Sequence, residues 1–166
     1  MKFLEKDLED YIFYVNNKRL KKEGLNFYYY KKFRQLKIGK YGVADLVTIS
    51  RPPFITDLKI FPEKIYITVY ELKKDELNNK TFFQAIRYLR GIKRYLEKRG
   101  KNLDNYCFNI VLLGKTLNLN EDLCYLPDIF YTYEGYSMID IYLYKIENNS
   151  IEFELQENFK LTDEGF

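Results

Sequence analysis

The chain has 166 residues, of which 46% are hydrophobic and 31% charged, and its formal net charge is +3. This length and composition predict one soluble globular domain, residues 1–166, with a core of ordinary size. The sequence contains no histidine, which excludes Ser-His, Cys-His and His-metal catalysis within this chain. Hydrolytic chemistry would therefore use carboxylates, lysine, tyrosine or a metal-bound water.

Export and membrane signals are not evident in the sequence. The first seven residues lack a continuous apolar run, so we expect no secretory signal and a cytoplasmic protein. No uninterrupted apolar segment approaches the length of a membrane span, so we expect no membrane partner. Cys107 and Cys124 do not form a metal-binding cluster, and we expect both to be reduced and buried.

Hydrophobic periodicity and turn residues predict the first elements. Leu4, Leu8, Ile12 and Val15 recur at helical spacing, and three prolines mark a later loop. The elements expected in this part are a helix over 3–18, a turn at Gly24, strands over 27–36 and 43–49 joined by a turn at 38–42, a loop over 50–63, and a strand over 65–73.

The second part begins with a long amphipathic helix, expected over 79–99 and ended by Gly100. The nearly all-apolar segment 106–113 is typical of a strand inside a sheet. The remaining expected elements are a short helix or loop at 119–126 and a hairpin of 139–146 with 151–155, turning at 148–150. The order is α-β-β-β-α-β followed by additional strands, which predicts an α/β protein with a mixed sheet of the α+β kind.

Three charged residues interrupt two of these strand-like segments. Asp45 lies within 43–49, and Glu71 and Lys73 end 65–73. Charges in such segments are costly to bury unless something compensates them. Two neighbouring carboxylates beside an ammonium would form an oxygen-ligand site for a hard cation such as Mg²⁺. The alternative reading is a plain cross-strand ion pair at a strand end.

Charge is distributed unevenly along the chain. Residues 119–166 carry a net charge of −9, whereas residues 1–118 carry +12. Basic clusters at 18–22, 31–34 and 87–101 would attract a polyanion such as DNA. The alternative is that these lysine-rich faces are simply solvated.

At this point the chain resembles a family. A helix, three strands with an Asp on the second and Glu-x-Lys at the end of the third, then a helix and a strand, are similar to the PD-(D/E)XK nuclease superfamily, and most of all to the catalytic domain of NucS-type endonucleases. The resemblance covers residues 4 to about 113, with weaker agreement through 155. It departs in the long 50–63 loop, in Gly42, which stands three residues before Asp45 in place of Pro, and in the acidic extension 119–166. The matching segments are Leu4 to Ile12, Arg34-Gln35, Gly42-x-x-Asp45, Tyr70-Glu71-Leu72-Lys73-Lys74 and Gln84-Ala85-Ile86-Arg87-Tyr88.

The resemblance implies a restriction-endonuclease-like core and a DNA endonuclease that depends on Mg²⁺ or Mn²⁺. Asp45 and Glu71 would hold the metal, with Glu9 as a further direct or water-mediated ligand. Lys73 would orient or help deprotonate the attacking water and offset transition-state charge, and Gln84 would position Lys73, a water or a phosphate oxygen. The residues expected to contact DNA are Arg34, Gln35, Arg87, Tyr88, Arg90 and Lys93.

Alternatives stay open for these residues and for the whole chain. Glu9 fits a solvated helix face equally well, and Gln84 with Tyr88 would share an exposed face of the long helix. For the whole chain we expect a structure- or single-strand-directed endonuclease, and the pairing common among small nucleases implies a homodimer. The first alternative is a catalytically inactive nuclease-fold module that binds nucleic acid or a partner protein. The second is a protein-interaction domain that uses the acidic residues 119–166.

Overall fold

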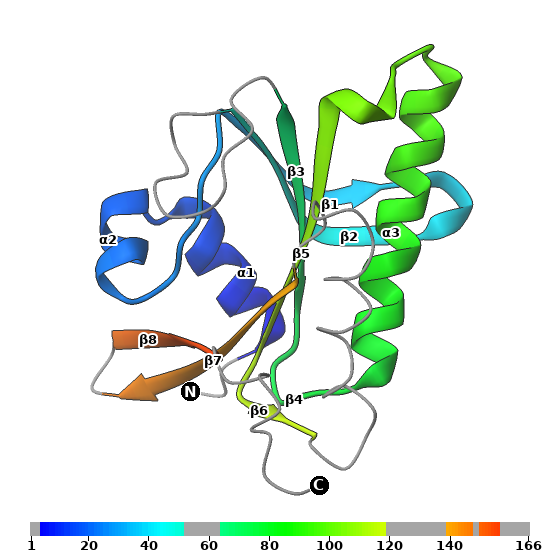
Figure 1. The fold of residues 1–166 in the computed structure, drawn as a ribbon. Helices are drawn as coiled ribbons and strands as arrows, with labels where there is room; N and C mark the ends of the chain where they lie inside the picture. Colours follow the sequence, from blue (N-terminus) through cyan, green and yellow to red (C-terminus); the bar gives the residue numbers. More distant parts are fainter. Residues whose placement is uncertain (1–3, 52–63, 119–138, 148–149, 157–166) are drawn as a thin grey trace, which may run out of the picture.

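The computed structural model describes residues 4–51, 64–118, 139–147 and 150–156. In these ranges a six-stranded mixed sheet, in the order β1-β2-β3-β5-β7-β8, is covered by helices on both faces (Figure 1). The predicted α/β class with a mixed sheet is therefore confirmed. The strands are β1 Lys31–Lys37, β2 Val43–Ser50, β3 Ile65–Leu72, β5 Tyr106–Gly114, β7 Ile139–Glu147 and β8 Ser150–Leu155.

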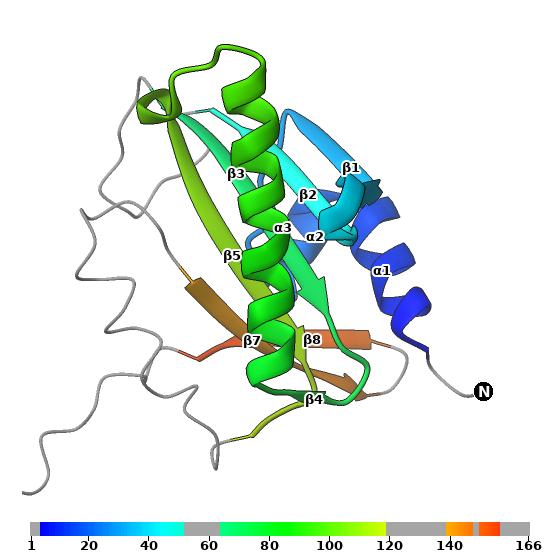
Figure 2. The ribbon, with the colours of Figure 1, turned by 90° about the vertical axis from the view of Figure 1, so that its right-hand side faces the viewer.

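Three α-helices and some shorter elements complete the described structure. Helices α1 and α2 lie on one side of the sheet, and α3 crosses the other side (Figures 1 and 2). The shorter elements are two 3-10 turns and a two-stranded parallel pair, β4 with β6. The bounds are α1 Glu5–Tyr14, α2 Asn17–Lys22, α3 Asn79–Lys98, η1 Gly39–Tyr41, η2 Leu103–Asn105, β4 Glu76–Leu77 and β6 Thr116–Leu117.

The sheet changes direction within its width. Strands β1, β2 and β3 are antiparallel, β3, β5 and β7 are parallel, and β8 returns antiparallel to β7. Because β3 and β5 are parallel, the chain must cross over between them, and α3 makes that crossover. The C-terminal ends of β3 and β5 therefore lie at the same end of the sheet. Helix α1 lies across the sheet at that end (Figure 1).

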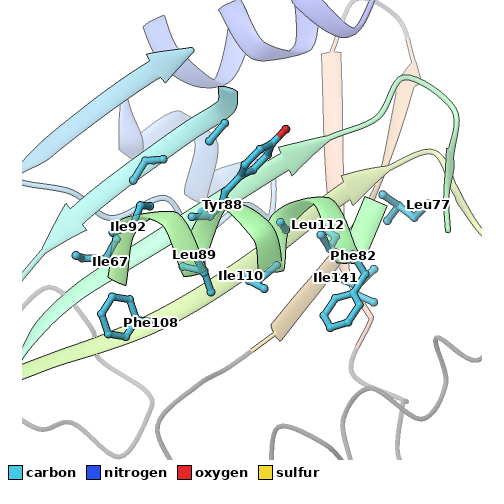
Figure 3. Packing of buried hydrophobic residues seen from close by; sticks show 14 residues of the cluster. Ile67, Leu77, Phe82, Tyr88, Leu89, Ile92, Phe108, Ile110, Leu112 and Ile141 are labelled. Carbon is cyan, nitrogen blue, oxygen red and sulfur yellow. The ribbon is translucent and has the colours of Figure 1, made fainter. Parts of the chain in front are cut away.

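Each face of the sheet buries its own apolar cluster, because side chains alternate along a strand. On the α3 side, Ile67 and Ile110 of the sheet belong to one buried cluster with Phe82 and Leu89 of α3 (Figure 3). On the α1 side, Leu8 of α1 packs with Tyr70, Leu72 and other strand residues. Apolar packing on both faces thus fixes the sheet near the end of β3, where Glu71 lies.

Most predicted elements are confirmed within one or two residues. These are the strands expected over 43–49, 65–73 and 106–113, the helix over 79–99, and the 139–146 and 151–155 hairpin. Gly100 has a positive φ of 67° and follows the end of α3 as expected. Cys107 is buried. Cys124, the 119–126 segment, most of the proline-rich loop and the hairpin residues 148 and 149 lie outside the described residues.

Two predicted elements were wrong in their extent. The helix expected over 3–18 ends at Tyr14, because Val15 is extended and the Asn16 side chain accepts a hydrogen bond from the Arg19 N–H to cap a separate helix, α2. The strand expected from residue 27 begins only at Lys31. Phe27 instead packs beneath the sheet, with its ring edge-on to Tyr70 at 5.0 Å between centroids.

Within the described residues, no helix is both long enough and apolar enough to cross a membrane.

Gly24 is required where the turn after α2 meets β8. Its φ is +96°, and a Cβ added there would lie 2.0 Å from the carbonyl oxygen of Phe153. The close approach lets the Phe153 N–H donate to the carbonyl oxygen of Glu23 at 2.7 Å. This hydrogen bond ties the C-terminal strand pair to the N-terminal helices.

We therefore expect Gly24→Ala to lower the free energy of unfolding by at least about 2 kcal/mol, since both the backbone conformation and the space oppose a methyl group. Gly100→Ala is the matched control, because Gly100 also has a positive φ but has open space around it. It should cost only about 1 kcal/mol. Urea unfolding of both variants measures the difference, and equal costs would contradict the steric argument.

Candidate functional site

The candidate site begins where β2 and β3 stop pairing. Their partners run from Ser50↔Tyr66 to Leu46↔Tyr70 and go no further, although both strands continue. The next residues in this register are Asp45 and Glu71. The Leu72 N–H, which faces the gap, donates to Asp45 Oδ2 at 3.0 Å. A side-chain carboxylate thus satisfies a strand N–H at the point where the two strands separate.

A polar row crosses three strands at this level. On β1, Gln35 falls between the paired residues Arg34↔Leu46 and Leu36↔Ala44, and so lies opposite Asp45. Gln35 has a φ of 47°, the one positive φ outside glycine in the described part of the chain. Such strained backbone persists only where its surroundings enforce it, and it is frequent at functional sites. Gln35, Asp45 and Glu71 therefore occupy one row across β1, β2 and β3.

Glu71 is the most deeply buried charged group of the row, with 1% of the residue exposed. Its Oε1 accepts a hydrogen bond from Lys73 Nζ at 2.8 Å, whereas its Oε2 has no hydrogen-bond partner among the described residues. Burial, together with the charge of Asp45, raises the pKa of Glu71 to about 7 despite the opposing effect of Lys73. A buried carboxylate oxygen without a partner is uncommon and calls for an explanation.

The two neighbours of Glu71 also have shifted pKa values. Burial raises the pKa of Asp45, although the Leu72 N–H and Lys73 oppose this. Burial alone would lower the pKa of Lys73, but the hydrogen bond to Glu71 and the charges of Glu71, Glu5 and Asp45 outweigh it and raise the pKa. Lys73 is therefore an ammonium held beside two carboxyl groups.

Glu9 belongs to a second, adjoining network. It is buried, and both of its carboxylate oxygens are engaged, Oε1 by Arg34 Nε and Oε2 by Gln35 Nε2 at 2.6 Å. Arg34 also pairs with Asp10, and Gln35 Nε2 reaches Asp45 Oδ1 at 3.4 Å. The reading of Glu9 as a solvated helix face was wrong. Arg34, expected at the DNA backbone, instead neutralises two carboxylates of α1.

Sequence reasoning missed Glu5, the first residue of α1. Its Oε2 accepts a hydrogen bond from the Lys74 N–H at 3.2 Å, and its Oε1 lies 3.9 Å from Lys73 Nζ. The available signal was its spacing, because residues four apart on a helix share a face and Glu5 precedes Glu9 by four. The N-terminal turn of α1 therefore brings a further carboxylate to Lys73.

Gln84 and Tyr88 of α3 contact each other. Gln84 Nε2 donates a hydrogen bond to the Tyr88 hydroxyl at 2.8 Å. The exposed face suggested for this pair was wrong for Tyr88, whose ring is buried in the α3-side cluster with its hydroxyl pointing out of it (Figure 3). A Cβ on Gly42 would lie 2.9 Å from that ring, so Gly42 permits the close packing of α3 at the start of β2.

The other residues expected to contact DNA lie at different places on α3. Arg87 and Arg90 are exposed, and Arg87 lies near Gly42. Lys93 is farther away, with its Nζ 4.7 Å from the centroid of the Phe108 ring and its pKa lowered by burial. Phe108 pairs with Ile67, four residues before Glu71 on β3, or about 13 Å along the strand. The structure thus does not bring Lys93 to the candidate site.

The acidic residues fit a magnesium-type ion better than an all-protein metal cage. In the described ranges no three Asp, Glu or Cys side chains gather closely enough to hold a metal ion by themselves. Mg²⁺, however, is usually bound by one or two carboxylates, with waters and substrate phosphates completing the shell. The partnerless buried oxygen of Glu71, beside Asp45, suits that donor set.

No protein-family model, curated protein or solved structure matches this chain. The function is therefore argued from the residues of the site.

The raised pKa of Glu71 predicts a pH dependence of stability in metal-free protein. The folded state holds the Glu71 proton up to a pH of about 7, whereas the unfolded chain releases it near 4.5. The folded state then binds more protons between these values, so stability falls as the pH rises through this window, by about 3 kcal/mol at most. Chemical denaturation at a series of pH values, with a chelator present, measures this slope.

Glu71→Gln should flatten that slope, because the amide does not titrate. Glu97→Gln provides the control, since Glu97 is an exposed carboxylate on α3 paired with Arg94. It should leave the slope unchanged. If wild type and Glu71→Gln show parallel pH profiles, the buried carboxyl group is not titrating as described.

Proposed function

We propose that this chain is a metal-dependent DNA endonuclease of the PD-(D/E)XK type that it resembles. The observation that carries the proposal is the separation of β2 and β3, which brings Asp45, the buried Glu71 and Lys73 to one point. A purely structural ion pair would leave no reason for the partnerless Glu71 oxygen or for the strained backbone of Gln35. Perturbed carboxyl groups beside a specific charge partner favour a functional site.

Different residues of the chain would have different roles in phosphodiester hydrolysis. Asp45 and Glu71 would hold Mg²⁺ or Mn²⁺, which when bound supplies polarisation of the phosphate and an acidified water. The Leu72 N–H fixes the Asp45 carboxylate, and Glu71 holds the Lys73 ammonium in place. Lys73 would orient the attacking water and offset negative charge that develops on the phosphate.

Single-strand or structure-directed action is favoured by exposed aromatic rings next to cations. Tyr14 and Tyr30 are 72% and 47% exposed. The Arg51 guanidinium lies 5.8 Å from the Tyr30 ring centroid, and Lys31 Nζ lies 6.0 Å from the same centroid. Unpaired bases stack on such rings while cations contact the phosphates. The excess of basic residues in 1–118 suits the same polyanion.

A second candidate function is a catalytically inactive module of the same kind. It is favoured by the complete engagement of Glu9 and by the absence, in the described residues, of a ready three-carboxylate cluster. Such a module would bind DNA in a salt-sensitive way without metal-dependent cleavage. The homodimer and the cytoplasmic location stay predictions.

A cleavage assay with Mg²⁺ and Mn²⁺ on single-stranded, duplex, flapped and four-way DNA tests the proposal. We expect metal-dependent cleavage that Asp45→Asn and Lys73→Ala each reduce by about 10²-fold or more, because each removes a charge needed in the transition state. Lys74→Ala is the matched control. The Lys74 side chain is 30% exposed, close to the 25% of Lys73, but its Nζ lies near Asp75, 3.8 Å from Oδ2.

Lys74→Ala should therefore retain nearly full activity. Cleavage that survives both Asp45→Asn and Lys73→Ala would contradict the assignment of this site as catalytic. DNA binding without any cleavage would favour the inactive module.

A further inference from the structure

Gln35 is the residue of β1 that contacts both helix α1 and the candidate site. Its Nε2 donates a hydrogen bond to Glu9 Oε2 at 2.6 Å and a longer one to Asp45 Oδ1 at 3.4 Å. A side-chain amide nitrogen carries two hydrogens that it can donate, so these two contacts use both. Gln35 thus joins a carboxylate of α1 to a carboxylate of β2.

The backbone of Gln35 has a conformation that is unfavourable for glutamine. Its φ is 47°, in the left-handed region that is favourable mainly for glycine and is tolerated by asparagine and aspartate. In the register between β1 and β2, Gln35 stands opposite Asp45. A strained conformation persists where the surrounding contacts enforce it. The strain therefore coincides with the point where the Gln35 side chain reaches Asp45.

The contact between Gln35 and Glu9 is firmly held. Glu9 is buried, and its other oxygen accepts a hydrogen bond from Arg34 Nε. The same guanidinium pairs with Asp10 of α1. Charge-assisted hydrogen bonds of this kind are among the strongest in proteins. Because Arg34 and Gln35 are consecutive on β1, helix α1 fixes the Gln35 amide on the side away from Asp45.

The Asp45 carboxylate accepts hydrogen bonds from both neighbouring strands. The Leu72 N–H of β3 donates to Oδ2 at 3.0 Å, and Gln35 of β1 donates to Oδ1. A carboxylate has about four lone-pair sites, so two hydrogen bonds leave room for a cation. With one donor on each oxygen, the carboxylate cannot rotate about its Cβ–Cγ bond without breaking a contact.

We propose that Gln35 is a positioning residue for the Asp45 carboxylate, with Glu9 holding its amide, and that this replaces the DNA contact implied for Gln35 by the resemblance. The inference rests on the proposed function, because the orientation of Asp45 matters for catalysis where that carboxylate holds a metal. Groups that hydrogen-bond to a metal-binding carboxylate affect activity without touching the substrate.

Amide hydrogen exchange in protein free of metal and DNA tests this positioning. Gln35→Asn suits the left-handed backbone but is one methylene too short to span both carboxylates. We expect the Leu72 N–H to exchange about fivefold faster relative to the Lys73 N–H, the factor that corresponds to one ordinary hydrogen bond. The Lys73 N–H donates to the Leu113 carbonyl oxygen at 2.8 Å and is the internal reference. A loss of global stability would speed both amides equally, and an unchanged ratio would overturn the inference.

Cleavage kinetics separate positioning from DNA contact. Gln35→Asn should lower kcat about 10-fold, as expected for a group that orients a metal-binding residue, and should leave KM for DNA nearly unchanged. Gln35→Gly, which also suits the backbone, should have the same effects on exchange and kcat. Lys37→Ala is the control, since Lys37 is exposed on the same strand, and it should change neither. A raised KM with unchanged kcat in Gln35→Asn would indicate a DNA contact and overturn the inference.

Failure of this inference can be distinguished from failure of the proposed function. Wild type that cleaves DNA, together with an unchanged kcat in Gln35→Asn, overturns the inference alone. Wild type that cleaves no DNA overturns the proposed function, and the exchange ratio of Leu72 to Lys73 then still decides whether Gln35 holds Asp45.

Discussion

The hydrogen bond from the Leu72 N–H to the Asp45 carboxylate marks the place on which the rest of the site depends. In a continuous antiparallel ladder that N–H would be satisfied by the backbone of the next strand. Here β2 and β3 stop pairing after Leu46 and Tyr70, and a side chain takes over. The separation leaves Asp45 and Glu71 beside each other at the strand ends, while β3 stays in register with β5 through Leu72↔Leu113.

Neighbouring charged groups offset the electrostatic cost of burying Glu71. Glu71 is almost wholly buried, and burying an unpaired charge is unfavourable. Lys73 compensates one of its oxygens, and Glu5 and Asp45 in turn favour the charge on Lys73. Around this centre, Glu9 and Arg34 form a separate ion pair that fastens α1 to β1. The site thus consists of an open part near Glu5 and a closed part near Glu9.

The sequence was most informative where local pattern and tertiary structure agree. Apolar alternation located β2 and β3, helical spacing located α3, and Asp45 and Glu71 stood out as charges within strand-like segments. It failed where a distant contact decides. The partners of Glu9 lie 25 and 26 residues away. The break between α1 and α2 had a local signal that was missed, because the Asn16 side chain caps α2 by accepting a hydrogen bond from the Arg19 N–H, three residues on. The left-handed backbone of Gln35 has no signature in the residue itself.

The position of Mn²⁺ in crystals of the protein, determined from anomalous scattering, tests the metal site at Asp45 and Glu71 most directly. We expect one ion in contact with the carboxylates of Asp45 and Glu71, with Glu71 Oε2, which has no hydrogen-bond partner among the described residues, as one of its ligands. An ion bound elsewhere on the chain, or no ion with Glu71 still paired only to Lys73, would contradict the metal site and leave Asp45, Glu71 and Lys73 as a structural charge cluster.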